Sequence, residues 1–346
     1  MLVELLKYSL FGGPVPLTAP LGVVRWRSLF EQSRSEAVTA LLYDAALKLP
    51  APLQPPHEVL FRLAAVARTI EDDNRRRSAA LHHFAAWMGS RLSLPTVVVK
   101  GSSLARHYPV PLHRECGDND IYTGSDTDRV ARLLAEDGVE VHRSNPRHMA
   151  FVYEQTDFEC HDYLLYSPDD EPQWQQVPFS EYELRAASGL CRLPIGQEAF
   201  FLAKHMEYHA VFFHVSVRLR DLVDWSLLLL SPEFDYAALC GEKAGSDVAC
   251  FADLLTHYCI HLFHLPADRV PSGVPALPKV LKAEDFERLY MHLPERHPMA
   301  LVRVARRSWH YLRYGRQFSR IYGRGMFGRF YLQNIRIALK NKKETH

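Results

Sequence analysis

The sequence predicts an α+β protein in which a small mixed, mostly antiparallel sheet is flanked by N-terminal helices and a C-terminal helical domain. Three observations support this prediction. Before residue 94, apolar residues recur at the three- and four-residue spacing of amphipathic helices. Between residues 96 and 166, short apolar or alternating runs are separated by turn residues, as in strands. Helical spacing returns after residue 193.

The composition is that of an ordinary globular protein. The 346 residues are 47% apolar and 23% charged, which predicts about two domains, and the net charge of +1 gives no preference for nucleic acid. Six cysteines without Cys-x-x-Cys spacing indicate reduced thiols. We find neither a signal peptide nor an apolar stretch long enough to span a bilayer, so we expect a cytoplasmic protein without a membrane span.

Residues 1–94 are predicted to form an N-terminal helical region. Gly12-Gly-Pro and the prolines between Pro50 and Pro56 indicate loops, and apolar spacing from His57 to Met88 indicates one long helix. This helix contains a charged run, Asp72 to Arg77. We interpret the run as a solvated face rather than a phosphate contact.

Residues 95–180 are predicted to form the mixed core. Its expected strands are Val97–Val99, the segment around Asp118–Tyr122, Val139–His142, Met149–Tyr153 and Phe158–Tyr166. Its expected helices are Ser102–His107 and Asp126–Glu136. Within residues 95–180 the dinucleotide-binding motif Gly-x-Gly-x-x-Gly is absent, which argues against a nucleotide fold of that type in this segment.

Residues 181–346 are predicted to form a helical domain that ends in a basic, aromatic segment. Helical spacing runs from Leu193 to about residue 265, and four prolines between Pro266 and Pro278 indicate a linker. The last 46 residues hold twelve Lys or Arg, one acid and eight aromatic residues. Packing of these aromatics on the body of the protein is the preferred interpretation, and binding of RNA or of an anionic membrane surface stays open.

The most informative stretch combines a glycine–serine turn with two closely spaced acids. Lys100-Gly101-Ser102 follows an apolar run, and Asp118 and Asp120 are spaced so that a strand would direct both to one side. Glu159, on a later strand, is a candidate third acid that shares a face with His161 and Tyr163. Carboxylates beside free backbone N–H groups suit a divalent cation and a polyphosphate.

These residues resemble the signature of the DNA polymerase β-like nucleotidyltransferase superfamily and, more narrowly, an uncharacterised bacterial nucleotidyltransferase family. The resemblance spans roughly Asn74 to Leu230. Further matching residues are Leu104, Tyr108-Pro109, Arg114, Gly117, Cys160-His161, His205, Leu219-Arg220 and Asp224-Trp225. The sequence departs from the family pattern at Asn119, where an apolar residue is usual, and at Glu159, where Asp is commoner.

The resemblance implies metal-dependent transfer of a nucleoside monophosphate from a nucleoside triphosphate (NTP), such as ATP, to an acceptor hydroxyl, with release of pyrophosphate. It implies that Asp118, Asp120 and Glu159 are catalytic and bind Mg²⁺ or Mn²⁺. The residues it implies for nucleotide binding are Lys100, Gly101, Ser102, Arg114, Lys204 and Arg220. The acceptor, a small molecule, a protein or RNA, stays open, as does the oligomeric state.

Two alternatives accompany this interpretation. The chain could be a catalytically degenerate relative, a nucleotide-binding sensor or partner-binding protein. RNA binding through the C-terminal segment is compatible with this alternative and with the enzyme. His205, His209 and His214 suggest zinc, but they lack a third ligand at the right spacing and the Glu of a zincin motif is misplaced. We therefore expect a packed histidine pair rather than a zinc site.

Overall fold

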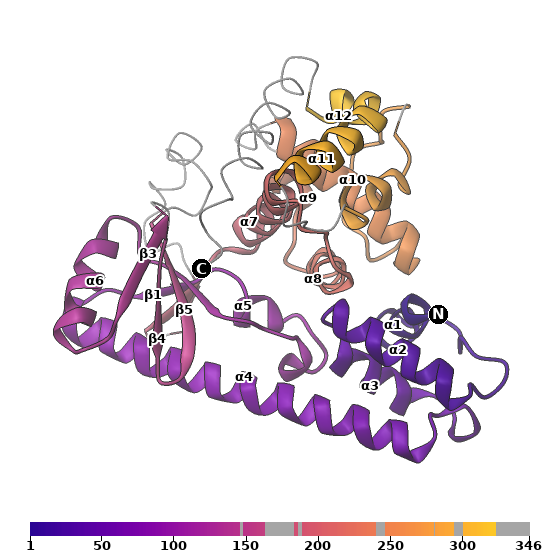
Figure 1. Ribbon diagram of the computed structural model, residues 1–346, viewed down its shortest axis with the longest axis horizontal. Coiled ribbons are helices and arrows are strands. Elements are labelled where there is room, and N and C mark those ends of the chain that lie inside the picture. Colours follow the sequence, from indigo (N-terminus) through magenta and orange to yellow (C-terminus); the bar gives the residue numbers. More distant parts are fainter. Residues whose placement is uncertain are drawn as a thin grey trace. The chain divides into compact units, whose positions relative to one another are not determined.

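The computed structural model describes residues 1–145, 148–162, 183–185, 189–239, 246–279, 281–293 and 300–322 (Figure 1). These residues belong to two compact units, each of which is described by itself. Unit 1 comprises residues 1–201 and 231–234, and unit 2 comprises residues 202–230 and those from 235 onward. The division into segments 1–94, 95–180 and 181–346 stays a prediction.

The N-terminal part of unit 1 is helical, as predicted. Its helices are α1 (Leu2–Phe11), α2 (Val23–Ser35), α3 (Thr39–Lys48) and the 36-residue α4 (His57–Leu92). The expected loops separate them, with a short 3₁₀ turn, η1 (Ala51–Leu53), among the prolines. Helices α2 and α3 pack along the N-terminal half of α4, and α1 packs on α3. The C-terminal half of α4 lies against the sheet (Figure 1).

The charged run on α4 is only partly a solvated face. Arg75 pairs with Glu71 at 2.6 Å and Arg76 pairs with Asp73 at 2.7 Å, and the side chains of both arginines are exposed. Asn74, by contrast, is buried and Arg77 is half-buried. The prediction is therefore wrong for these two residues, because the register of the helix turns them toward the loop after residue 110.

The sheet of unit 1 is mixed and mostly antiparallel, as predicted. Its strand order is β3-β4-β5-β2-β1-β7-β6, in which only the β5–β2 and β1–β7 pairs are parallel. The strands are β1 (Thr96–Val98), β2 (Asn119–Tyr122), β3 (Val141–Asn145), β4 (His148–Tyr153), β5 (Thr156–His161), β6 (Glu183–Arg185) and β7 (Leu190–Arg192). The predicted extension of β5 through residues 163–166 lies outside the described residues.

Short helical segments connect the strands. They are α5 (Ser102–Ala105), η2 (Pro111–His113), η3 (Gly124–Asp126) and α6 (Thr127–Glu136). One apolar core lies between the sheet and helices α4 and α6, and Phe84 of α4 contacts Phe158 of β5 within it, with ring centroids 5.1 Å apart. Val98 and Ile121 point into this core. Because side chains alternate along a strand, Asp120 and Tyr122 point to the opposite face.

Unit 2 consists of helices and turns in the residues that the structure describes. They are the C-terminal part of α7 (Ile195–Tyr208), η6 (His209–Phe213), α8 (Leu219–Leu229), α9 (Tyr236–Leu239), α10 (Ser246–Phe263), η7 (Glu287–Met291), α11 (Ala300–Arg313) and α12 (Gly315–Ile321). The expected helical region and the helix-free stretch after residue 265 are both confirmed. Within the described chain, no helix combines the length and apolarity needed to cross a membrane.

The described part of the C-terminal segment packs its aromatics unevenly. Tyr311, Phe318 and Tyr322 are buried, and the Tyr311 hydroxyl donates a hydrogen bond to the Val211 carbonyl at 2.7 Å. Trp309, however, is 68% exposed. The tail aromatics Phe327, Phe330 and Tyr331 lie outside the described residues.

Candidate active site

Two parallel strands bring the candidate acids together. Asp120 on β2 and Glu159 on β5 are directly paired in the register of these strands. Residues paired across neighbouring strands direct their side chains to the same face of the sheet, so the two carboxylates lie next to each other. Asp120 is almost completely buried, whereas the side chain of Glu159 is 30% exposed.

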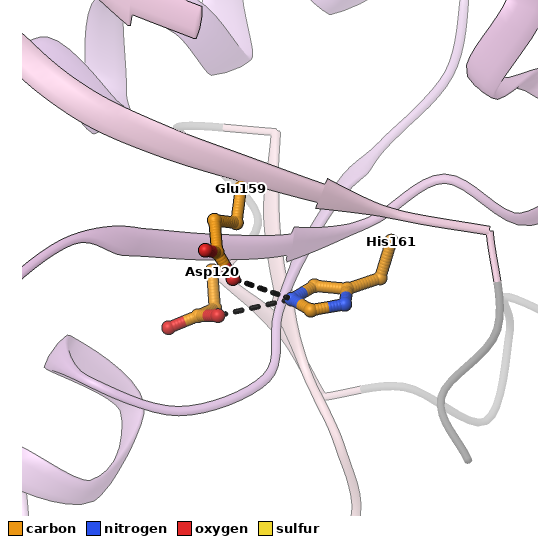
Figure 2. A group of neighbouring side chains, drawn as sticks. All are labelled: Asp120, Glu159 and His161. Carbon is orange, nitrogen blue, oxygen red and sulfur yellow. Dashed lines mark hydrogen bonds and ion pairs between the residues drawn. The ribbon is translucent and has the colours of Figure 1, made fainter. Parts of the chain in front are cut away.

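His161 completes a cluster with these two acids (Figure 2). Its Nε2 lies 2.9 Å from Oδ1 of Asp120 and 3.9 Å from Oε2 of Glu159. One ligand atom from each of the three residues lies within 4.8 Å of the others. His148 on β4 adds a second imidazole, with Nε2 3.7 Å from Oε1 of Glu159.

Lys100 supplies the positive charge at Asp120. It follows β1, and its Nζ lies 2.9 Å from the same Oδ1 that His161 contacts. Burial would raise the pKa of Asp120, but the Lys100 ammonium and the hydrogen bond from His161 outweigh it and hold the pKa well below its usual range. Asp120 is therefore ionised, and His161 must carry a proton on Nε2 to donate to it.

Asp118 lies immediately before β2 and is half-buried. Its pKa is raised, first by burial and then by the negative charge of Asp120, with Lys100 opposing both. Two carboxylates whose pKa values move apart in this way are electrostatically coupled. The charges of Asp118 and Asp120 therefore interact, although Asp118 is not part of the group of Asp120, Glu159 and His161, and its role as a metal ligand stays a prediction.

Gly101 allows the backbone to approach Asp118. Its φ of 59° and ψ of −110° belong to a region that side-chain-bearing residues rarely adopt, and a Cβ there would lie 3.4 Å from the Asp118 carbonyl oxygen. The glycine of Lys100-Gly101-Ser102 is thus required by backbone geometry. It permits the chain to turn from β1 into α5 directly beside the acids.

The donor atoms of this cluster fit a hard divalent cation. Mg²⁺ and Mn²⁺ prefer carboxylate oxygens, which Asp120 and Glu159 provide within the cluster. Oδ2 of Asp120 is buried and has no hydrogen-bond partner among the described residues. A buried carboxylate oxygen without a donor is costly, and a cation would satisfy it. His161 orients Asp120 through its hydrogen bond, as residues behind a metal ligand commonly do.

The other candidate nucleotide-binding residues are distributed over both units. In unit 1, Ser102 begins α5 and is half-buried, while Arg114 is buried with its Nη1 3.2 Å from the sulfur of Cys116. In unit 2, Lys204 pairs with Glu207 at 3.2 Å and Arg220 pairs with Asp221 at 3.0 Å. Within unit 1, neither Ser102 nor Arg114 belongs to the group of Asp120, Glu159 and His161. The nucleotide-binding roles of all four residues stay predictions.

The sequence predicts that His161 shares a strand face with Glu159, but its hydrogen bond to Asp120 was not predicted. The signal was available in the Glu-x-His spacing, because alternate strand residues share a face. The zinc hypothesis for the later histidines has no support in the described residues, where only Asp120, Glu159 and His161 form a group able to hold a metal ion. The rings of His205 and His209 pack against each other with centroids 4.1 Å apart.

Comparison with known protein families identifies the family of this chain. A family model described as an uncharacterised nucleotidyltransferase matches residues 23–264, well over half of the chain. The chain belongs to this family. The match to the nucleotidyltransferase family extends beyond residues 74–230 at both ends, so it includes most of the N-terminal helices and much of unit 2. No curated protein and no solved structure matches the chain.

Proposed function

We propose that the chain is a metal-dependent nucleotidyltransferase of the DNA polymerase β-like superfamily. It would transfer a nucleoside monophosphate from an NTP to an acceptor hydroxyl and release pyrophosphate. The observation that carries the proposal is the buried, ionised Asp120 next to Glu159, with one carboxylate oxygen that lacks a hydrogen-bond partner in the described chain. Membership of a nucleotidyltransferase family supports the reaction class.

The burial of each acidic residue suggests its role in the proposed reaction. Asp118 and Asp120 would hold the cation, which when bound neutralises charge that develops on the reacting phosphate oxygens. Glu159, which is the more exposed acid, would contribute a further ligand oxygen and accept the proton of the acceptor hydroxyl. The Gly101 turn brings backbone close to the Asp118 carbonyl, where the triphosphate would lie.

A matched pair of variants on β5 tests the metal site. Glu159→Gln should weaken Mn²⁺ binding measured by calorimetry and abolish pyrophosphate release from NTPs, whereas Asp157→Asn should leave both intact. Asp157 is the control because it lies two residues from Glu159 on the same face of β5 but outside the cluster. Equal Mn²⁺ affinity in the wild type and in Asp120→Asn would contradict the proposal.

One observation favours a second candidate function, nucleotide binding without turnover. Lys100 and His161 already contact Oδ1 of Asp120 at 2.9 Å each, so the charge of this carboxylate is neutralised by the protein itself. A degenerate relative could retain such a site for its stability. Saturable NTP binding without pyrophosphate release, when the four NTPs are incubated with Mn²⁺ and cell extract, would favour this candidate.

A further inference from the structure

A second concave site lies on the opposite face of the sheet from the carboxylates. A cavity of about 300 Å³ is bounded by α4, α5, the η2 loop and the ends of β1, β2 and β7. Asn119 of β2 lines it and donates from Nδ2 to the Arg77 carbonyl of α4 at 3.3 Å. Because Asp120 is the next residue along the strand, its side chain points away from this cavity. The volume is that of a small-ligand pocket.

The walls of the cavity are mainly apolar. The aliphatic surface comes from Leu81 of α4, Val98 of β1, Ala105 of α5, Leu112 of η2 and Leu190 of β7. Such walls suit a ring or a short chain, since burying apolar surface contributes about 25 cal/mol per Å². A ligand here would thus gain affinity from an apolar body.

The polar part of the lining is positively charged. Arg77, Arg106 and Arg192 line the cavity together with His82, and none of the described lining residues is acidic. Arg106 is committed elsewhere, because its Nη2 lies 2.9 Å from Oε2 of the buried Glu198. Arg77, in contrast, forms no ion pair with a carboxylate of the described residues.

The charge of Arg77 is not compensated by any carboxylate among the described residues. Its Nε donates to the Gly117 carbonyl at 2.9 Å, and its Nη1 lies 3.5 Å from Oδ1 of Asn74, both neutral acceptors. Its helical neighbours Arg75 and Arg76 each form close ion pairs with acids. A half-buried guanidinium beside an apolar cavity is therefore available for a bidentate contact to a phosphate or carboxylate.

We propose that this cavity is a binding site for a small amphipathic anion, an apolar ring or chain that carries one phosphate or carboxylate. The anionic group contacts the Arg77 guanidinium, and the apolar body packs among Leu81, Ala105 and Leu190. The site lies on the other face of the sheet from the carboxylate cluster, and Ser102, which is predicted above to bind nucleotide, is among its lining residues. It also adjoins the loop that carries Asp118, because Arg77 donates to the carbonyl of the preceding residue, Gly117.

Calorimetric titration with three probes tests the site without any turnover. The probes are phenyl phosphate, benzoate and the neutral benzyl alcohol, each titrated into the full chain without NTP or divalent cation. We expect saturable one-to-one binding of at least one anionic probe and binding of benzyl alcohol that is about tenfold weaker or more. The ratio between phenyl phosphate and benzoate identifies which anionic group the site prefers.

Three variants locate the bound probe. Arg77→Gln should weaken anion binding about tenfold or more, since it removes a charge-assisted contact. Arg76→Gln, one residue away and paired with Asp73 on the exposed side, should leave the affinity unchanged. Ala105→Leu should reduce binding by filling the cavity, which provides an independent readout if Arg77→Gln proves unstable on thermal melting.

Three results would overturn the proposal. One is the absence of saturable binding by phenyl phosphate and benzoate at millimolar concentration. A second is anion binding that survives both Arg77→Gln and Ala105→Leu unchanged in folded protein. Anion binding that is lost in Asp118→Asn but kept in Arg77→Gln would place the probe at the carboxylate cluster and would equally refute a separate site.

Discussion

The ammonium of Lys100 and the carboxylate of Asp120 form a buried ion pair, with Nζ 2.9 Å from Oδ1 and Asp120 only 1% exposed. Since Lys100 directly follows β1 and Asp120 lies within β2, this contact joins the two central strands on the face that carries the cluster. The pair therefore controls how much negative charge the cluster presents.

Removing Lys100 should make the protein depend on a divalent cation. Lys100→Met leaves Asp120 buried without its ammonium, which should lower the free energy of unfolding by roughly 3 kcal/mol when chelator is present. The same loss of positive charge should strengthen cation binding, so Mn²⁺ should raise the melting temperature more in the variant than in the wild type.

Arg143→Met provides the matched control for this prediction. Arg143 pairs with Asp162 at 2.8 Å in the same unit but at the exposed surface, so its removal should be nearly neutral and independent of Mn²⁺. An identical Mn²⁺ shift in Lys100→Met and in the wild type would show that the cation does not bind at Asp120.

The backbone at Gly101 gives a second prediction. Gly101→Ala forces a side chain into a strained conformation and brings its Cβ to 3.4 Å from the Asp118 carbonyl, so stability should fall by about 1–3 kcal/mol and Mn²⁺ affinity should fall with it. Chemical denaturation and calorimetry measure the two effects. In Gly196→Ala, where a Cβ meets nothing within 4 Å in a helix, stability should stay equal or rise.

The candidate site was predictable from sequence where it depends on local periodicity. Asp120, Glu159 and the Gly101 turn follow from strand alternation and glycine geometry, together with the family resemblance. Strands β6 and β7 were not predicted, because the three-residue segment Leu190–Arg192 lacks the run of consecutive valines that indicated β1 and becomes visible only by pairing with that strand. Arg77 was assigned to a solvated face because its partner, Gly117, is distant in sequence.

His113 gives a prediction about pH. Its Nδ1 lies 2.8 Å from Asp44 of α3 and its Nε2 lies 3.0 Å from Glu71 of α4. The hydrogen bond to Asp44, opposed by burial and aided by that to Glu71, raises the pKa of His113. Because the folded state holds the proton more tightly, this stabilisation is complete below the ordinary histidine pKa of about 6.5 and is lost as pH rises through the raised value.

Measurements of the free energy of unfolding across this pH range test the contacts of His113 with Asp44 and Glu71. The free energy of unfolding of the wild type should decline above about pH 6.5, whereas His113→Gln should be less stable by roughly 1–3 kcal/mol at low pH and show a flatter profile. His57→Gln, at the exposed start of α4, should reproduce the wild-type profile. A variant at His113 with an unaltered pH profile would exclude the imidazole as the origin of the decline.

The C-terminal segment allows a last prediction, because it contains both a buried and an exposed aromatic within the described residues. Phe318 is 2% exposed and contacts the ring of Tyr311 at a centroid distance of 4.9 Å, whereas Trp309 on α11 is 68% exposed. Phe318→Ala should lower stability by about 3–5 kcal/mol, and Trp309→Ala should change it by less than about 0.5 kcal/mol.

The same two variants separate packing from RNA binding. If the segment serves to cover unit 2, the wild type should show no salt-sensitive binding of single-stranded RNA, and only Phe318→Ala should lower the melting temperature. RNA binding whose logarithm falls linearly with log salt, and which Trp309→Ala weakens without any change in melting temperature, would instead identify α11 as an RNA contact. We expect the packing result, because Tyr311, Phe318 and Tyr322 are all buried.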